Sequence, residues 1–142
     1  DPPRVLPPRE AIVAAVRGWA AGVGNTLALS ADVVIADTTA RFWVPFVPKG
    51  FTPDSGTTWL LPRLVGLARA KEMVLRGTPV DAARADSWGL ISRCVEPDEL
   101  EAGVAEVVDE LRSAATVSIG LARQLLHQNL TASLPAAPVV DP

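Results

Sequence analysis

The segment PDSG places one carboxylate, that of Asp54, where turn-forming residues give way to an apolar stretch, TTWLLPRLVG. Upstream, the glycine-rich turn AGVG at Ala21–Gly24 precedes a second apolar stretch, NTLALS. The first N–H groups of a helix have no partner within the helix, so such a turn can hold an anion or a polarised carbonyl oxygen. A loop-borne acid and an oxygen-binding turn are two parts of proton-transfer chemistry next to a carbonyl group.

Each feature also has a purely structural interpretation, which is the more common one when the feature stands alone. The glycine turn can serve only to pack a helix against a strand. Asp54 can be a helix N-cap that accepts hydrogen bonds from the N–H groups of Gly56 or Thr57. In the functional interpretation Asp54 is a general base, shielded from water by nearby apolar side chains such as Phe51 and Trp59.

The composition excludes several classes of function. The 142 residues are 49% hydrophobic, with a mean hydropathy of +0.25 and a net charge of −3. Without a basic cluster, nucleic acid is not an expected partner. No apolar run reaches the roughly 18 residues that a membrane span needs. The apolar content instead suggests a surface that faces another subunit or another part of a longer chain.

The chain has one cysteine, Cys94, and one histidine, His127. An internal disulfide and a zinc site with Cys/His spacing are therefore excluded, so no metal is expected. Because Cys94 has no evident base and His127 no evident partner, neither is expected to be catalytic. Free thiols are typical of a reducing compartment, which predicts a cytoplasmic location.

The hydrophobic pattern predicts a chain of the α/β class. Proline-rich ends at residues 1–8 and 131–142 indicate flexible tails around one domain at residues 9–130. In the first half we expect a strand over Ala11–Val16, a turn over Gly22–Gly24, a helix over Asn25–Ser30, strands over Val33–Ala36 and Arg41–Val44, and a loop over Pro45–Pro53.

The second half is predicted to be mainly helical. Pro62 should end or kink the first helix, Gly77 should end the second, and Asp81 should cap the third. Pro97 and the acids after it are typical of the start of a long amphipathic helix. The expected elements are helices over Ser55–Leu64, Ala68–Arg76 and Ala82–Trp88, a strand over Leu90–Val95, the long helix from Pro97, and a last helix over Val117–Leu130.

Three stretches together resemble the crotonase, or enoyl-CoA hydratase/isomerase, superfamily. They are AIVAAVRGWAAGVGNTLALSADVVIADTTARF, LPRLVGLARAKEMVLRGTPVDAARADSWGLISRCVEPDEL and the later LARQLL. The resemblance covers nearly everything from Pro8 to about Leu130. It implies a spiral of strand-strand-helix repeats followed by a helical region, of which this chain would hold only a part. Full members of the family usually run to roughly twice the length of this chain.

The resemblance implies an acyl-CoA thioester as substrate, with coenzyme A as part of it and no separate cofactor. The backbone N–H of Val23 matches a family donor to the thioester oxygen as it becomes an enolate. A homotrimer or hexamer is implied as the assembly. Small residues of the turn and aromatic side chains are expected to contact the substrate, namely Trp19, Ala21, Gly22, Gly24, Thr26, Phe46 and Phe51. With Trp59, the aromatic side chains would form an apolar pocket that excludes water.

Two departures from the family pattern indicate a branch within it. The two glutamates with which hydratases activate water correspond to Thr26 and Phe46, and neither side chain can replace a carboxylate. The chain resembles instead the isomerase branch, in which a single acid occupies the position of Asp54. That branch includes ring-opening isomerases of phenylacetate breakdown and enoyl-CoA delta isomerases. Two alternatives stay open: an enoyl-CoA hydratase of fatty-acid β-oxidation, and a non-catalytic acyl-CoA-binding remnant of the fold.

Overall fold

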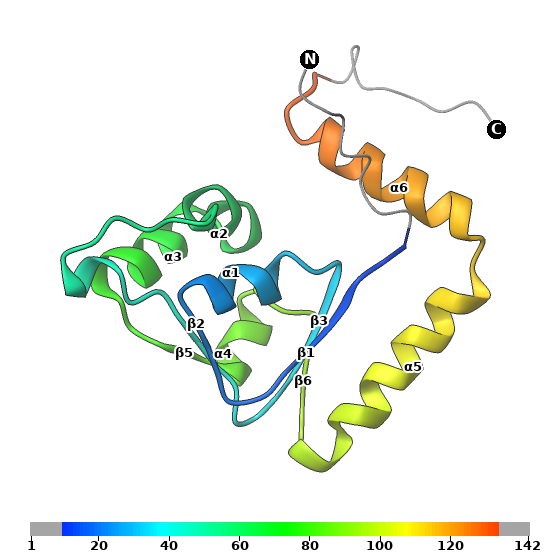
Figure 1. Cartoon of the computed structure of the whole chain (residues 1–142), viewed down its shortest axis with the longest axis horizontal. Helices are drawn as coiled ribbons and strands as arrows, with labels where there is room; N and C mark the ends of the chain where they lie inside the picture. Colours follow the sequence, from blue (N-terminus) through cyan, green and yellow to red (C-terminus); the bar gives the residue numbers. More distant parts are fainter. Residues whose placement is uncertain (1–9, 134–142) are drawn as a thin grey trace. The chain divides into compact units, whose positions relative to one another are not determined.

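The computed structural model describes residues 10–133 (Figure 1). The chain divides into two compact units, one at Ile12–Val107 and one that holds residues 10–11 and 108–133 of the described part. The predicted tail at residues 1–8, and the part of the second tail from residue 134 onward, lie outside the described residues. The boundaries of a single domain at residues 9–130 stay a prediction.

Six short strands form two three-stranded sheets in the larger unit. The first sheet has the order β1-β3-β6 and is parallel throughout. The second has the order β2-β4-β5, in which β2 and β4 are parallel and β5 is antiparallel to β4. The strands are β1 (Val13–Val16), β2 (Trp19–Ala21), β3 (Val33–Asp37), β4 (Arg41–Trp43), β5 (Val80–Asp81) and β6 (Arg93–Val95).

The strand pairing shows one turn of a spiral. The pair β1 and β2 is followed by helix α1 (Val23–Leu29), and the chain then adds β3 beside β1 and β4 beside β2. In register, Val13 lies opposite Val33 and Trp19 lies opposite Arg41. The predicted α/β class with strand-strand-helix repeats is confirmed. The helix α1 is thereby held at the point where the chain passes from one sheet layer to the next.

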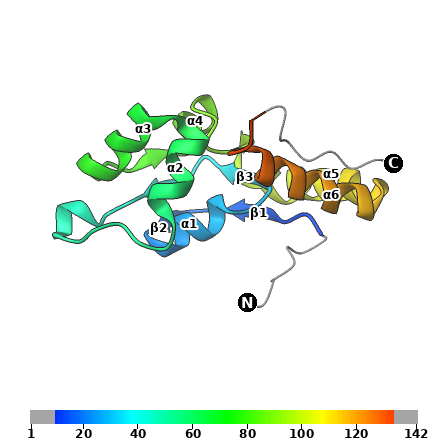
Figure 2. The ribbon, with the colours of Figure 1, turned by 90° about the horizontal axis from the view of Figure 1, so that it is seen from above.

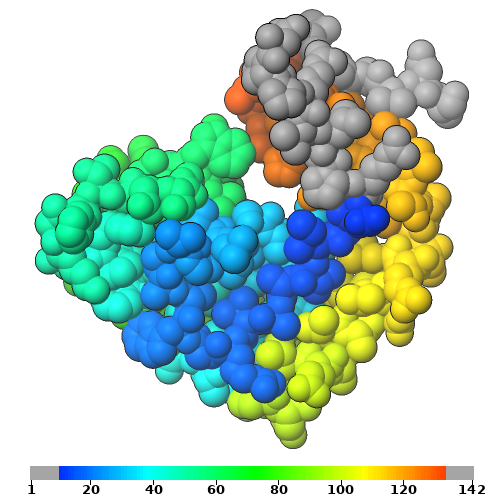
Figure 3. Space-filling model, viewed as in Figure 1, coloured from blue at the N-terminus to red at the C-terminus, as the bar shows by residue number. Residues whose placement is uncertain are grey.

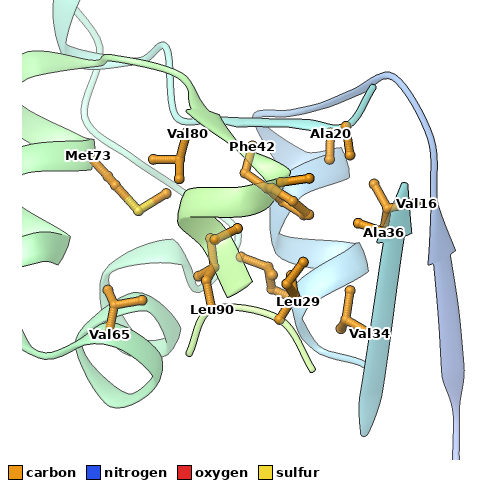
Figure 4. Packing of buried hydrophobic residues seen from close by; sticks show 14 of the residues in the cluster. Val16, Ala20, Leu29, Val34, Ala36, Phe42, Val65, Met73, Val80 and Leu90 are labelled. Carbon is orange, nitrogen blue, oxygen red and sulfur yellow. The ribbon is translucent and has the colours of Figure 1, made fainter. Parts of the chain in front are cut away.

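In the larger unit an apolar core lies between these strands and the helices among residues 23–87 (Figure 4). Phe42 on β4 is fully buried and lies among side chains from both sheets and from several helices. Burying such a side chain contributes about 1.5–3 kcal/mol. From α1 the core takes Leu29 and from β3 it takes Val34 and Ala36. The core therefore fixes α1 against β3 and β4.

Helix α2 (Thr57–Val65) contacts α1 (Figure 2) and does not end at Pro62. Of the two predicted effects of Pro62, an end of the helix is wrong, and a kink stays a prediction. Proline removes one N–H and so one helical hydrogen bond. Here the buried side chains of Leu61 and Val65, one helical turn apart, anchor the helix around Pro62. Tertiary packing outweighs the lost hydrogen bond.

The next two helix boundaries agree with the sequence. Helix α3 (Leu67–Lys71) continues into a π-helical turn at Glu72–Arg76, which ends at Gly77 with φ 61°. A Cβ at Gly77 would also collide with the ring of Pro48, so only glycine fits this position. Helix α4 (Ala82–Ser87) begins at Asp81, whose side chain accepts a hydrogen bond from the N–H of Arg84 at 2.8 Å. The predicted N-cap is confirmed.

Strands β2 and β5 were not predicted. They have three and two residues, which is too short for an alternating apolar pattern to appear. The expected strand at Leu90–Val95 is shorter than predicted, because Leu90 and Ile91 pack into the core before β6 begins. These differences concern pairing between distant segments, which local sequence does not encode.

Helix α5 (Leu100–Ser113) follows a turn at Pro97–Glu99 and buries Leu100 and Gly103. Helix α6 (Thr116–Asn129) belongs to the smaller unit and buries none of its residues. Both helices were predicted. Among residues 10–133, no helix is at once long enough and apolar enough to cross a bilayer.

A buried carboxylate, Asp37, closes the end of β3. Its Oδ1 accepts the Thr39 N–H at 2.9 Å and the Thr39 hydroxyl, and its Oδ2 accepts the Arg17 Nε–H at 2.9 Å. Burial by itself would raise the pKa of Asp37, but the hydrogen bonds from Thr39 and Arg17 outweigh it and lower the pKa below 3.8. The ionised form is therefore the one that the fold stabilises.

This lowered pKa predicts a pH dependence of stability. A depressed folded-state pKa contributes stability that is present above the unfolded-state pKa of about 3.9 and is lost as the pH falls through the folded-state value. The free energy of unfolding of Asp37→Asn should therefore be lower than that of the wild type by about 1–3 kcal/mol at pH 7. Below about pH 4 the free energy of unfolding should fall less steeply in Asp37→Asn than in the wild type. Urea unfolding between pH 7 and pH 3 measures both effects, with Asp109→Asn as an exposed control. If the free energy of unfolding fell with pH in the same way for the wild type and Asp37→Asn, a lowered pKa of Asp37 would be contradicted.

Candidate functional site

The glycine turn ahead of α1 is built around Gly22, whose φ of 57° and ψ of −122° suit glycine only. Its N–H donates to the carbonyl of Trp43 at 2.9 Å, which ties the turn to β4. Its carbonyl accepts the N–H groups of Asn25 and Thr26 at 3.1 and 3.3 Å. By helix geometry the amides of Val23 and Gly24 come before the first helical hydrogen bond. They are therefore the donors that this turn can offer to a ligand.

Phe46 lies against this turn. A Cβ added to Gly22 would meet the Phe46 ring at 3.6 Å, and Phe46 itself is half-buried against the core. Val23 is exposed beside it. The structure thus places Phe46 against Gly22, and it pairs Ala21 with Trp43 in the adjoining strands. The role of these residues as substrate contacts stays a prediction. Figure 3 shows the blue spheres of β2 and α1 on the visible face of the molecule.

Asp54 lies in a loop that is shaped by two residues with positive φ, Ser55 at 53° and Gly56 at 79°. Its carboxylate is exposed and accepts the Ser55 hydroxyl at 3.0 Å. Its backbone carbonyl, and not its side chain, accepts the Thr57 N–H at 3.0 Å. Gly56 occupies the N-cap position of α2. The capping alternative for Asp54 is therefore wrong, and the carboxylate is left available for chemistry.

The expected water-excluding pocket of aromatic side chains is not formed by the described residues. Trp19, Phe51 and Trp59 are 63%, 68% and 50% exposed. Trp19 belongs to an edge strand, and its ring lies 5.5 Å from that of Trp43. Trp59 is on the side of α2 opposite the buried Leu61. Among residues 10–133 only Phe46 of the four rings packs on the core, and a shared water-excluding pocket stays a prediction.

Thr26 makes a contact within the protein that was not expected, and its role as a substrate contact stays a prediction. Its hydroxyl lies 2.8 Å from the hydroxyl of Thr57, the first residue of α2. Thr57 is 1% exposed, so this bond is made inside the protein. Sequence reasoning missed Thr57 as part of the site. In the sequence, Thr57 and Thr58 directly follow PDSG, but nothing there indicates that Thr57 has a partner on α1.

Asn25 was also missed. It follows Val23 and Gly24 on α1, is 1% exposed, and its side-chain Nδ2 and Oδ1 have no hydrogen-bond partner among residues 10–133. An unpaired buried polar group costs about 1–3 kcal/mol. A polar residue within the apolar stretch NTLALS was the available signal. Its position one turn before the buried Leu29 explains the burial.

The remaining reactive side chains do not add to the site. Burial, with a smaller contribution from the carboxylate of Asp86, raises the pKa of the Cys94 thiol above its ordinary value. A thiol that stays protonated is a poor nucleophile. Within the described part of the chain, no three His, Cys, Asp or Glu side chains gather as metal ligands would.

Comparison with known proteins gives consistent matches. Residues 5–141 match the family model described as enoyl-CoA hydratase/isomerase. The 1,2-epoxyphenylacetyl-CoA isomerase of Escherichia coli K12 is 39% identical over 123 residues, which are 87% of this chain and 47% of that protein. The short-chain-enoyl-CoA hydratase of Clostridium acetobutylicum is 36% identical over 126 residues, 89% of this chain and 48% of that protein.

Solved structures agree with these matches. An enoyl-CoA hydratase/isomerase from Cupriavidus metallidurans CH34 gives a TM-score of 0.85 at 37% identity, over 88% of this chain and 47% of that one. A monofunctional enoyl CoA isomerase from M. smegmatis gives a TM-score of 0.84 at 36% identity, over 94% of this chain and 63% of that one. The chain thus spans about half the length of the curated relatives that it matches.

Proposed function

Because this chain belongs to the enoyl-CoA hydratase/isomerase family, we propose that it carries the reacting groups of an isomerase that shifts the double bond of an enoyl-CoA thioester. The reaction passes through an enolate whose oxygen is held by backbone N–H groups. Asp54 is the single acid and base. Val23 supplies one of the N–H groups. Coenzyme A is part of the substrate, and no separate cofactor takes part.

The proposed reaction needs only one carboxylate. Asp54 takes a proton from the α carbon of a 3-enoyl thioester, and the electron pair of the broken C–H bond delocalises over the carbonyl and the double bond. The Val23 N–H donates to the oxygen as negative charge develops there, which lowers the barrier. Asp54 then returns the proton to the γ carbon. The double bond has moved by one position, and neither water nor an electron acceptor is consumed.

The observation that carries this proposal is a contact between the starts of the two helices that follow the AGVG turn and the PDSG loop. The hydroxyl bond between Thr26 and Thr57 at 2.8 Å links the helix that follows one to the helix that follows the other. At the two positions where the resemblance implies hydratase glutamates, this chain has Thr26 and Phe46. Relatives that are named as isomerases, at 39% and 36% identity, add support.

Two other functions compete with this one. Hydration of an enoyl-CoA is favoured by relatives that are named as hydratases. Against it, Thr26 has a hydroxyl and Phe46 a phenyl ring, and neither of them is a base that could activate water. Binding of an acyl-CoA without turnover is the second competitor, and it is favoured by the exposure of Trp19, Phe51 and Trp59. A homotrimer or hexamer is proposed as the assembly from the family resemblance.

The experiment that tests the proposal is incubation of the full-length gene product with a 3-enoyl-CoA in deuterated water. We expect a 2-enoyl-CoA product with deuterium at the α or γ carbon, detected by mass spectrometry and NMR. A 3-hydroxyacyl-CoA as the primary product would favour the hydratase. Saturable binding with neither product nor label would favour the non-catalytic alternative, and either result would overturn the isomerase proposal.

A further inference from the structure

We propose that Thr26 and Thr57 are positioning residues, which fix the donor at Val23 relative to the acid at Asp54. They do so through three hydrogen bonds that are joined by the two threonines and are called the hydrogen-bonded line below. The inference rests on the proposed function for the roles of Val23 and Asp54. It assigns to the two threonines no contact with the substrate. The first bond joins the Thr26 N–H to the Gly22 carbonyl, and the last joins the Thr57 N–H to the Asp54 carbonyl. The middle bond joins the hydroxyls of the two threonines.

The first bond holds the donor. The carbonyl of Gly22 and the N–H of Val23 belong to one peptide unit, which is planar and rigid. The N–H of Thr26 donates to that Gly22 carbonyl at 3.3 Å. A shift of Thr26 therefore moves the same plane that directs the Val23 N–H outward. The orientation of the donor depends on where the first turn of α1 is held.

The last bond holds the acid. The N–H of Thr57 donates to the backbone carbonyl of Asp54 at 3.0 Å. Between them stand Ser55 and Gly56, both with positive φ, so the loop is a tight turn that closes on Thr57. Because Thr57 is also the first residue of α2, the position of the Asp54 carboxylate depends on how that helix start is fixed.

The middle bond joins the two halves. The hydroxyls of Thr26 and Thr57 lie 2.8 Å apart, although the residues are 31 apart in the chain. Thr57 is 1% exposed, so bulk water does not replace this bond without a rearrangement of the helix start. The Thr26 hydroxyl therefore has Thr57 as a partner within the protein. Loss of either hydroxyl leaves the other unpaired in a largely buried place.

Valine is the matched substitution, since it keeps the shape of threonine and removes the hydroxyl. We expect Thr26→Val and Thr57→Val each to lower kcat by about 10- to 100-fold with KM changed by less than about twofold, because small displacements of reacting groups affect turnover strongly. The double variant should lose no more than either single variant, since the two hydroxyls act as a unit. Thr57→Ser should recover most of kcat. Thr58→Val, at the adjacent exposed threonine, is the control.

Three results would overturn the inference. A raised KM with unchanged kcat in Thr26→Val would make Thr26 a substrate contact. Losses that multiply in the double variant would make the hydroxyls independent. Reduced stability in urea with unchanged kcat would leave the pair a merely structural role.

A second measurement separates this inference from the proposed isomerase activity. In protein labelled with ¹⁵N-valine, the Val23 amide resonance, identified by its loss in Val23→Ala, should shift in Thr57→Val and return in Thr57→Ser. If the wild type shows no isomerase turnover but this shift occurs, the proposed function fails and the hydrogen-bonded line stands. If turnover is present and the Val23 resonance does not respond, the positioning role fails while the function stands.

Discussion

Asp54→Asn is expected to lower isomerase turnover by about 10²- to 10⁴-fold, the usual contribution of a general acid or base. Asparagine keeps the size of the side chain but cannot accept the α proton. Because the carboxylate is exposed and its side chain receives a hydrogen bond only from the adjacent Ser55 among the described contacts, the free energy of unfolding should change by no more than about 0.5 kcal/mol. Turnover is measured by deuterium incorporation and stability by urea unfolding.

The control for this variant is Asp109→Asn, which removes the same charge from an exposed site on α5. It should retain full turnover. If Asp54→Asn keeps wild-type turnover, the acid and base lies elsewhere. If Asp54→Asn loses stability and Asp109→Asn does not, the carboxylate has a structural role that the observed hydrogen bonds do not explain.

Gly22→Ala is expected to lower turnover by about 10²- to 10³-fold, as removal of one oxyanion donor does. With φ 57° and ψ −122°, Gly22 has a conformation that strains any other residue by about 1–3 kcal/mol. Relief of that strain rotates the peptide plane between Gly22 and Val23, which carries the proposed donor. We expect lower kcat together with a modest loss of stability.

Gly66→Ala separates the loss of the donor from strain in general. Gly66 has φ 80° and ψ 165°, an equally restricted conformation, and a Cβ there would meet no atom within 4 Å. It stands between α2 and α3, at the end of α2 opposite to the one that carries Thr57. Stability should fall by a similar amount while turnover is kept. Equal loss of turnover in both variants would contradict a specific role for the Gly22–Val23 peptide.

The sequence predicted those parts of the structure that depend on local chemistry. Asp81 as an N-cap and Gly77 as a helix end are decided by a few neighbouring residues, and both agree with the structure. Pro62 does not end its helix, because the burial of Leu61 holds the helix in place, and burial is a tertiary quantity. Strand β5 was missed because a two-residue strand exists only through its partner.

In the candidate site, too, the features set by local sequence were predictable and those set by tertiary packing were not. The glycine turn and the Asp54 loop follow from residue types that favour tight turns, so their local forms were predictable. The partnership of Thr26 with Thr57 depends on the packing of α1 against α2, and no pattern in either helix encodes it. The exposure of Trp19 and Phe51 likewise depends on what surrounds them in three dimensions.

The parallel pairing of β3 with β6 has a consequence for the synthesis of this protein. Ala36 pairs with Cys94, so the partner of β3 is completed long after β3 itself. About 60 residues at about 5–20 residues per second correspond to a delay of roughly 3–12 s at the ribosome. During that delay β3 can pair with β1 on one side only, and its other edge presents unpaired N–H and C=O groups beside an apolar strand. The nascent chain therefore passes through a stage in which β3 is a site for wrong pairing or for a chaperone.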